Sequence, residues 1–282
     1  MGYQWYPGHM TKAKRMMQED IRLTDIVIEI VDARVPMSSR NPDIDSMAGG
    51  RGRIIIMNKA DLADPAVSSE WIRYYKNSGI NAVLLDSRCR KDMQTVSKAV
   101  TEASAAKIAR DKRRGIKNST VRIFVAGIPN VGKSTFINSF TGKSGAKTGN
   151  KPGVTRGDQW IHMNGGRDIL DTPGILWPKF EDETVGLHLA WVGTMNDEIL
   201  DMSDMALQLI DFMMDRYKDI LFSRYDIIND GLPQDILGMI AENRKCLKQG
   251  GDPDLDKAAQ LLLGEFRSGR IGRISIERPQ ET

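Results

Sequence analysis

Short β-branched runs alternate with longer amphipathic stretches along the first 170 residues of the chain. The runs typical of strands cover residues 25–32, 53–57, 82–85 and 121–126. The stretches typical of helices cover residues 11–22, 65–77 and 93–108, and a further one begins at Lys133. A hairpin is expected from strands at 159–163 and 168–170, joined by Asn164-Gly165-Gly166. Strands that alternate with helices predict an α/β fold with a mostly parallel sheet.

The pattern changes near Trp177 and Pro178. Beyond them the hydrophobic spacing is helical, over residues 184–195, 203–217, 233–243 and 253–267. No segment of this part has the alternation typical of a strand. We therefore expect a first domain over residues 1–178 and a small, all-helical domain over residues 179–282.

The segment GIPNVGKS, residues 127–134, follows a predicted strand and precedes a predicted helix. Glycines in such a loop let backbone N–H groups turn toward phosphates, and the helix presents its positive end. Lys133 is expected to reach the β- and γ-phosphates, and the Ser134 hydroxyl is expected to bind Mg²⁺. The other predicted contacts of this phosphate loop are Asn130, Val131, Gly132 and Thr135.

A second motif, Asn58-Lys59-Ala60-Asp61, is typical of loops that recognise guanine. Asp61 can accept hydrogen bonds from guanine N1–H and from the exocyclic amine, whereas adenine would leave the carboxylate unpaired. The Lys59 stem can cover one face of the base, and Asn58 can link this motif to the phosphate loop. Asp86 and Ser87, after another predicted strand, are the expected last contacts with the base, although a basic segment follows where small residues are usual.

A third motif is Asp171-Thr172-Pro173-Gly174. Asp171 ends a predicted strand, where a carboxylate can bind Mg²⁺ through water, and the Gly174 amide can meet the γ-phosphate. The Gly-rich segment 147–156 contains Thr155, which is the best candidate for a second hydroxyl ligand of Mg²⁺. The alternative is that Thr155 is an ordinary loop residue.

These motifs stand in an unusual order. In ordinary GTPases the phosphate loop comes first and the guanine motif last, whereas here Asn58 to Asp61 precede Gly127. The order predicts a circularly permuted P-loop GTPase domain that binds GTP and GDP. A metabolic kinase is disfavoured, because Asn58 and Asp61 select guanine and no second-substrate motif is visible.

The permuted order and three further segments resemble the bacterial ribosome biogenesis GTPase A family. These segments are Trp5 to Met10, Asp32 to Pro42 and Gly174 to Lys179. The resemblance covers essentially the whole chain and is loosest in the C-terminal helical part. It implies a role in late assembly of the large (50S) ribosomal subunit, binding to the pre-50S particle and its rRNA, and GTP hydrolysis stimulated by the ribosome.

Two features bear on hydrolysis. Ile175 follows Gly174, where many GTPases have a glutamine that orients water; the resemblance implies that His9 is the catalytic residue instead, with a structural role as the alternative. Asn130 occupies a position at which several GTPases without that glutamine coordinate K⁺, which could supply the charge of an arginine finger. The alternative is that Asn130 only continues the turn after Pro129.

The net charge of +3 over 282 residues does not establish nucleic-acid binding. Basic residues do cluster, beside His9, over residues 107–117 and near the C-terminus, but RNA binding is expected from the resemblance rather than from these charges. Cys89 and Cys246 lie far apart and are expected to be reduced thiols. With no apolar run of membrane-spanning length and no signal segment, we expect a cytoplasmic protein without a membrane partner, monomeric when free.

Two other functions remain open at this point. One is a translation-linked GTPase that uses the same nucleotide chemistry on a different RNA client. The other is a signalling switch that binds a protein effector through its helical domain.

Overall fold

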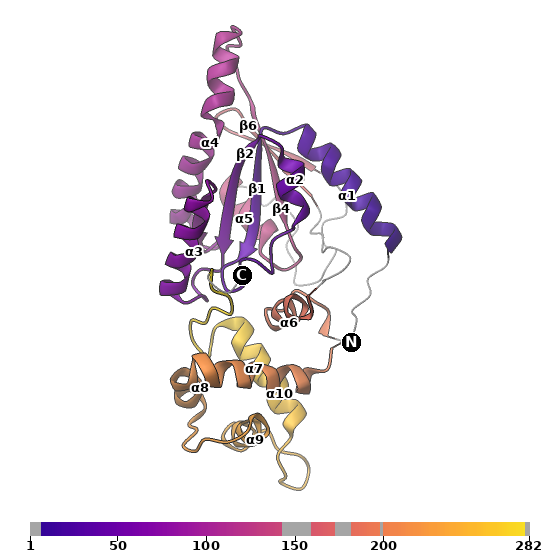
Figure 1. The fold of residues 1–282 in the computed structure, drawn as a ribbon, viewed down its shortest axis with the longest axis vertical. Coiled ribbons are helices and arrows are strands. Elements are labelled where there is room, and N and C mark those ends of the chain that lie inside the picture. Colours follow the sequence, from indigo (N-terminus) through magenta and orange to yellow (C-terminus); the bar gives the residue numbers. More distant parts are fainter. Residues whose placement is uncertain (1–6, 143–158, 173–181, 198–199, 280–282) are drawn as a thin grey trace. The chain divides into compact units, whose positions relative to one another are not determined.

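The computed structural model describes residues 7–142, 159–172, 182–197 and 200–279, with side chains described from Lys14 onward. The chain divides into two compact units (Figure 1). The first contains Met1–Glu183 and also Ser275–Thr282, and the second contains Thr184–Ile274. The helical unit is therefore an insertion in the chain of the first unit, since the C-terminal residues return to the first unit rather than ending in the second.

A six-stranded sheet forms the centre of the first unit, in the order β3-β2-β1-β4-β6-β5. Its strands are β1 Ile26–Asp32, β2 Gly52–Asn58, β3 Asn81–Leu85, β4 Val121–Gly127, β5 Gln159–Met163 and β6 Arg167–Asp171. All neighbouring strands are parallel except β5 and β6, which pair antiparallel with Gln159 opposite Asp171. The predicted α/β sheet and its hairpin are confirmed.

The helices described in the first unit are α1 Pro7–Arg22, α2 Asp43–Ala48, α3 Pro65–Asn77, α4 Met93–Arg113 and α5 Lys133–Thr141. On one face of the sheet, Val27 packs with residues of α1 and α2, and Met57 packs with Trp71 of α3. Gly52 points to the other face, where an added Cβ would meet the carbonyl oxygen of Ala103 in α4 at 2.8 Å. Helices thus cover both faces, as a buried parallel sheet requires.

Local signals explain where α3 begins. Asp64 is its N-cap and accepts hydrogen bonds from the backbone of Ala66 and Val67, while Pro65 occupies the first helical position. The sequence predicts both features. By contrast, α4 continues to Arg113, beyond its predicted end at residue 108, and includes much of the basic cluster over residues 107–117.

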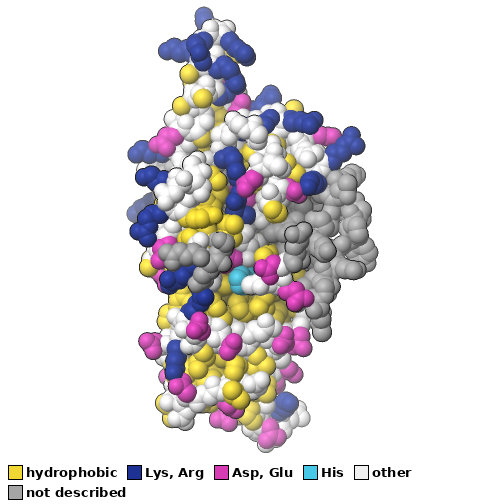
Figure 2. All heavy atoms as spheres, in the orientation of Figure 1, with side chains coloured by type: hydrophobic (Ala, Val, Ile, Leu, Met, Phe, Trp, Pro, Cys, Tyr) yellow, Lys and Arg dark blue, Asp and Glu magenta, His cyan; other side chains and the backbone are white. Residues whose placement is uncertain are grey.

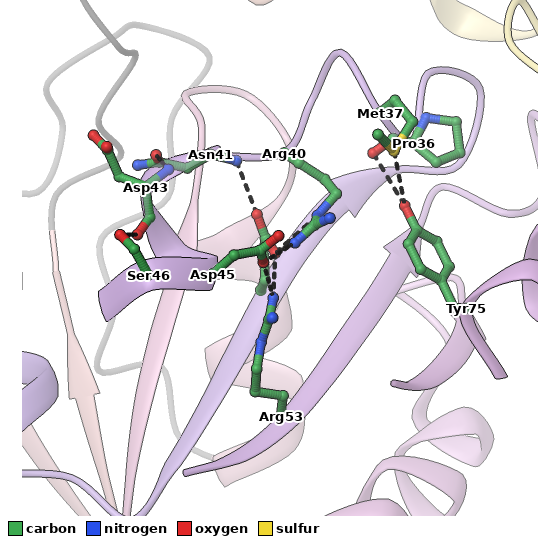
Figure 3. Close-up of polar contacts among 10 residues, drawn as sticks. Pro36, Met37, Arg40, Asn41, Asp43, Asp45, Ser46, Arg53 and Tyr75 are labelled. Carbon is green, nitrogen blue, oxygen red and sulfur yellow. Dashed lines mark hydrogen bonds and ion pairs between the residues drawn. The ribbon is translucent and has the colours of Figure 1, made fainter. Parts of the chain in front are cut away.

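A cluster of charged residues surrounds the buried Glu29 on the same sheet face as α1 to α3 (Figure 3). Glu29 of β1 sits between the two apolar clusters, and its carboxylate accepts hydrogen bonds from Arg40 at 3.2 Å and from the backbone N–H of Asn41 at 2.8 Å. Arg40 and Arg53 both lie 2.5 Å from Asp45, so the cluster contains two cations and two carboxylates. Burial raises the pKa of Glu29, although Arg40 and Arg53 oppose this shift. The cluster holds the loop after β1 on the sheet.

The C-terminal segment also contacts this loop. The Glu277 carboxylate accepts hydrogen bonds from the backbone N–H groups of Met37, at 2.7 Å, and Ser38, at 3.1 Å, and from the Ser38 hydroxyl. Its carbonyl oxygen accepts a hydrogen bond from the indole of Trp71 in α3 at 3.0 Å. Two residues earlier, the Ser275 hydroxyl accepts from the backbone of Asp64 at 3.1 Å. Glu277 thereby contacts the loop after β1, and Ser275 contacts the loop after β2.

The second unit is helical. Its elements are α6 Glu183–Trp191, α7 Met202–Arg216, α8 Lys218–Tyr225, α9 Pro233–Asn243 and α10 Leu255–Ser268. Helix α10 packs against α7 and α9, and Glu265 of α10 accepts hydrogen bonds from Arg224 and Tyr225 of α8. The sequence predicts four of these helices but not α8, which has eight residues and no side-chain N-cap. None of the helices described is long and apolar enough to cross a membrane.

Candidate nucleotide-binding site

The predicted motifs that fall in the described residues meet at one edge of the sheet. Parallel strands present their carboxyl ends at the same edge, which is where α/β proteins bind ligands. Asn58 ends β2, Ser87 follows β3, the phosphate loop follows β4, and Asp171 ends β6. Motifs separated by more than a hundred residues in the sequence therefore lie at a single site.

The phosphate loop has the backbone geometry that its glycines allow. Gly132 has a φ of 97°, and an added Cβ would lie 2.3 Å from the side-chain nitrogen of Asn58. Gly127 lies against β1, where a Cβ would lie 3.1 Å from the carbonyl oxygen of Ile30. Asn130 has a φ of 61°, a left-handed conformation that asparagine tolerates better than most residues. This conformation gives Asn130 a backbone role that does not depend on a cation.

Asn58 links the guanine motif to the phosphate loop. Its side-chain amide donates a hydrogen bond to the carbonyl oxygen of Val131 at 2.7 Å. Its side-chain oxygen accepts hydrogen bonds from the backbone N–H and the hydroxyl of Ser87, at 3.0 and 2.7 Å. The Ser139 hydroxyl of α5 donates to the carbonyl oxygen of Ser87 at 2.6 Å. The three segments are thus fixed relative to one another through one buried asparagine.

Lys133 and Asp171 form a buried ion pair. The Lys133 Nζ lies 2.8 Å from Asp171 Oδ1, and the two side chains are 5% and 2% exposed. Ser134 and Thr135 follow Lys133 in the first turn of α5 and are half-buried. The Ser134 hydroxyl at the start of α5 and the Asp171 carboxylate at the end of β6 are hard oxygen ligands of the kind that suits Mg²⁺ beside phosphates. The residues present therefore fit this ion.

The two carboxylates expected to read the base share one arginine. Arg88 donates to Asp61 Oδ2 at 2.6 Å, and it also donates to both carboxylate oxygens of Asp86, at 2.9 and 3.0 Å. The hydrogen bonds from Arg88 lower the pKa of Asp86. Because Arg88 is 68% exposed and Asp61 33% exposed, their contact is a surface ion pair that a ligand can replace.

Lys59 has a partner that the sequence does not suggest. Its Nζ lies 3.0 Å from Asp32 at the end of β1, and Asp32 also pairs with the buried guanidinium of Arg34 at 2.9 Å. Burial alone would raise the pKa of Asp32, but the charges of Arg34 and Lys59 hold it well below its usual range. Lys59 has a φ of 58°, which turns the chain sharply between Asn58 and Asp61.

Some predicted site residues lie outside the described part of the chain. Gly174 and Thr155 are among them, as is Ile175. For His9 the backbone is described, in the first turn of α1, but the side chain is not. Within the described residues no cluster of three or more His, Cys, Asp or Glu side chains could hold a metal ion. Among the described residues, the candidate Mg²⁺ ligands are therefore Ser134 and Asp171.

Comparisons with known proteins agree with this geometry. Residues 122–240 match the family model described as 50S ribosome-binding GTPase. Over its full length the chain is 45% identical to ribosome biogenesis GTPase A of Priestia megaterium, covering 98% of that protein. The chain belongs to the ribosome biogenesis GTPase A family. It is accordingly a GTPase, and another family member, from Thermotoga maritima, is 31% identical over 98% of the chain.

Solved structures of ribosome biogenesis GTPase A relatives share the fold. A GDP-bound structure of TM YlqF is 27% identical, with a TM-score of 0.66 over 94% of this chain and 100% of that one. The GNP-bound YlqF from T. maritima is 29% identical, with a TM-score of 0.65 over 95% and 99% of the two chains. The fold that carries Asn58, Gly127 and Asp171 in this chain is therefore shared with solved structures.

Two residues at the site, Asp32 and Arg88, are not predicted from the sequence. Asp32 ends β1 at the sheet edge where the carboxyl ends of the parallel strands lie. That position alone could have indicated it as a candidate partner for Lys59. Arg88 is visible in the sequence only as an unusual cation after Ser87. Its pairing with Asp61 depends on the spatial neighbourhood of β2 and β3, which no local pattern contains.

Proposed function

We propose that this chain binds and hydrolyses GTP in the cytoplasm and acts in late assembly of the large ribosomal subunit. In this role it binds the immature 50S particle and its rRNA, and it is a monomer when free. The observation that supports this best is the single buried asparagine that joins the guanine motif to the phosphate loop. The names of the full-length relatives support the choice of client.

Each motif has a distinct task in this proposal. Asp61 accepts hydrogen bonds from guanine N1–H and the exocyclic amine, and these replace its hydrogen bond with Arg88. Lys133 moves its ammonium from Asp171 to the β- and γ-phosphates, and the Ser134 hydroxyl holds Mg²⁺. Asp171, no longer paired with Lys133, would hold that ion through water. Mg²⁺ supplies charge stabilisation for the phosphates when it is bound.

The hydrolytic step is assigned to His9, whose imidazole would orient the attacking water in place of the usual glutamine. Thr155 is proposed as the second hydroxyl ligand of Mg²⁺, and the Gly174 amide as the sensor of the γ-phosphate. Asn130 is proposed to bind K⁺ beside the phosphates. These four assignments rest on the sequence motifs and on the family.

GTP turnover with and without purified 50S subunits, in KCl and in NaCl, tests the enzymatic part. We expect the subunits to stimulate turnover, K⁺ to exceed Na⁺, and Lys133→Ala to abolish activity. Equal turnover in both salts would remove Asn130 as a K⁺ ligand while leaving the GTPase assignment intact.

Co-sedimentation tests the client. We expect the chain to sediment with immature 50S particles in preference to mature 50S or 30S subunits. An RNase-resistant complex with a protein from the lysate, in the absence of binding to any subunit, would favour the effector switch instead. Binding to another RNA with no preference for immature 50S would favour a different translation-linked client.

A further inference from the structure

Helix α4 is much longer than the sheet needs. Val100 is its last buried apolar residue, and beyond it only Ser104 and Asp111 are buried in this helix. From residue 105 to 118 every residue is exposed except Lys107, which is half-buried, and Asp111. In Figure 1 the end of α4 projects beyond the sheet of its own unit. Because this helix end contributes little to the core, packing does not explain its length, and a binding role is the alternative.

Asp111 is the only acidic residue between 103 and 120, and it faces inward. Its carboxylate accepts hydrogen bonds from the Ser119 hydroxyl at 2.7 Å and lies 3.0 Å from the Lys107 ammonium. Its backbone carbonyl accepts from the N–H of Ile116 at 3.0 Å. Asp111 and Lys107 thus neutralise each other while closing the turn that returns the chain to β4.

The remaining cations have no such compensation. They are Arg110, Lys112, Arg113, Arg114 and Lys117, all exposed. The side chains of these five form no hydrogen bond or salt bridge with another described residue, although Arg110 is attracted electrostatically to Asp111. Figure 2 shows Lys and Arg atoms gathered at this tip without a carboxylate among them. The helix dipole favours cations only within the last turn, so it does not account for Lys117 beyond the helix end.

The directions of these cations indicate the kind of partner. At 100° per residue, Arg110, Lys112 and Arg113 point to different sides of the helix. A helix that lies on a membrane surface needs one apolar face opposite one basic face, which this tip lacks. A rod with cations on several sides instead fits between two rows of phosphates, as in a groove or junction of folded RNA.

We propose that the projecting end of α4 binds folded RNA by inserting between phosphate rows, with Arg110, Lys112, Arg113, Arg114 and Lys117 contacting the backbone. This inference rests on the proposed function, because that function supplies rRNA as the client. It adds the surface of the chain that makes the contact and the manner of recognition, which is independent of base sequence.

The test compares two variants that lose the same charge. The first is Arg110→Gln, Arg113→Gln, Arg114→Gln and Lys117→Gln combined. The control combines Arg73→Gln, Lys76→Gln, Lys91→Gln and Lys98→Gln, four exposed cations of the same unit whose side chains form no hydrogen bond or salt bridge with described residues. Affinity for transcribed large-subunit rRNA is measured from about 50 to 200 mM KCl. Basal GTP turnover and thermal melting check that both variants fold.

We expect the tip variant to bind at least about tenfold more weakly. The slope of log affinity against log salt concentration should also be shallower by about 3, because each of the four lost phosphate contacts removes roughly 0.7–0.9 from that slope. The control should bind like the wild-type chain. Equal losses in the two variants would overturn the proposal by showing only a net-charge effect. Wild-type affinity in the tip variant would overturn it while leaving the proposed function in place.

Two further outcomes separate this inference from its premise. If the wild-type chain binds neither rRNA nor 50S particles, the proposed function fails, and the inference with it. If the wild-type chain binds vesicles of anionic phospholipid through the same four residues but does not bind rRNA, the tip is a membrane contact and the inference is wrong.

Discussion

The side-chain amide of Asn58 donates to the carbonyl oxygen of Val131 at 2.7 Å, across 73 residues of sequence. Val131 lies in the phosphate loop, and Asn58 also holds Ser87 at the expected base site. The same amide nitrogen fills the space that a side chain at Gly132 would need. The segments proposed to recognise the base and to bind the phosphates are therefore joined in one hydrogen-bonded structure.

Asn58→Ala should lower the free energy of unfolding by about 2 kcal/mol, because it leaves buried polar groups of Val131 and Ser87 without partners. GTP and GDP affinity should fall together, since both need the linked loops. Urea unfolding and fluorescent-nucleotide titration measure the two effects. Asn77→Ala, at the exposed end of α3, is the matched control and should change neither. Unchanged nucleotide affinity in Asn58→Ala would show that the link is dispensable.

Asp61→Asn should shift base preference from guanine to xanthine, because the new amide donates where xanthine presents a carbonyl. The measurement is a competition between GTP and XTP for the same labelled nucleotide. Arg88→Ala provides the comparison: it removes a surface ion pair worth about 0–1 kcal/mol, so GTP affinity should rise by no more than about fivefold, with guanine still preferred. A loss of guanine preference in Arg88→Ala would instead make this arginine a base contact.

His9→Ala should reduce GTP turnover far more than GTP affinity, since a group that orients water acts mainly in the transition state. Single-turnover hydrolysis and equilibrium binding separate the two quantities. Lys14→Ala, farther along the same helix and exposed, serves as the control for a general disturbance of α1. Weaker GTP binding with normal turnover would assign His9 a structural role.

Asp32→Asn should cost about 3 kcal/mol of unfolding free energy at pH 7, because Arg34 and Lys59 lose a buried counter-charge. The folded-state pKa of Asp32 is lowered, so the stability it contributes is complete above the ordinary aspartate pKa of about 3.9. That contribution is lost as the pH falls through the folded value.

The difference between wild type and Asp32→Asn should therefore be constant from neutral pH to about 5 and shrink below about 4. Denaturant unfolding at a series of pH values measures it. Asp43→Asn removes a partly exposed pair with Lys14 and should have an effect below about 1 kcal/mol at every pH. A difference that grows on acidification would contradict the assigned direction of the pKa shift.

Glu277→Gln should destabilise the first unit by about 1–3 kcal/mol, because an amide replaces the charged acceptor of two backbone N–H groups. Hydrogen exchange at Met37 and Ser38 should become faster, which locates the effect at the loop after β1. Glu70→Gln, on the surface of α3, controls for the loss of one negative charge. Normal exchange in Glu277→Gln would mean that the C-terminal segment does not hold this loop.

Local patterns carry much of the fold. The β-branched runs and the Asp64-Pro65 signal predict the strands and the start of α3, because strand periodicity and capping depend on neighbouring residues alone. The phosphate loop and guanine tetrad are visible for the same reason. Glu277 contacts Met37 across 240 residues, and Arg88 joins two loops through space. Such contacts form only once the sheet has brought distant segments together, so a short stretch of sequence does not predict them.

Ser275 and Glu277 belong to the first unit but follow the helical unit in the sequence, so the ribosome synthesises them after it. During synthesis the strands, the phosphate loop and the guanine motif all emerge before the residues that join the loops after β1 and β2 exist. Until Glu277 has been synthesised, the indole of Trp71 and the backbone of Met37 lack their acceptors. A chain that stops short of Ser275 contains every nucleotide motif but not those contacts. The protein thus completes its GTPase unit only after the whole helical unit, Thr184–Ile274, has been synthesised.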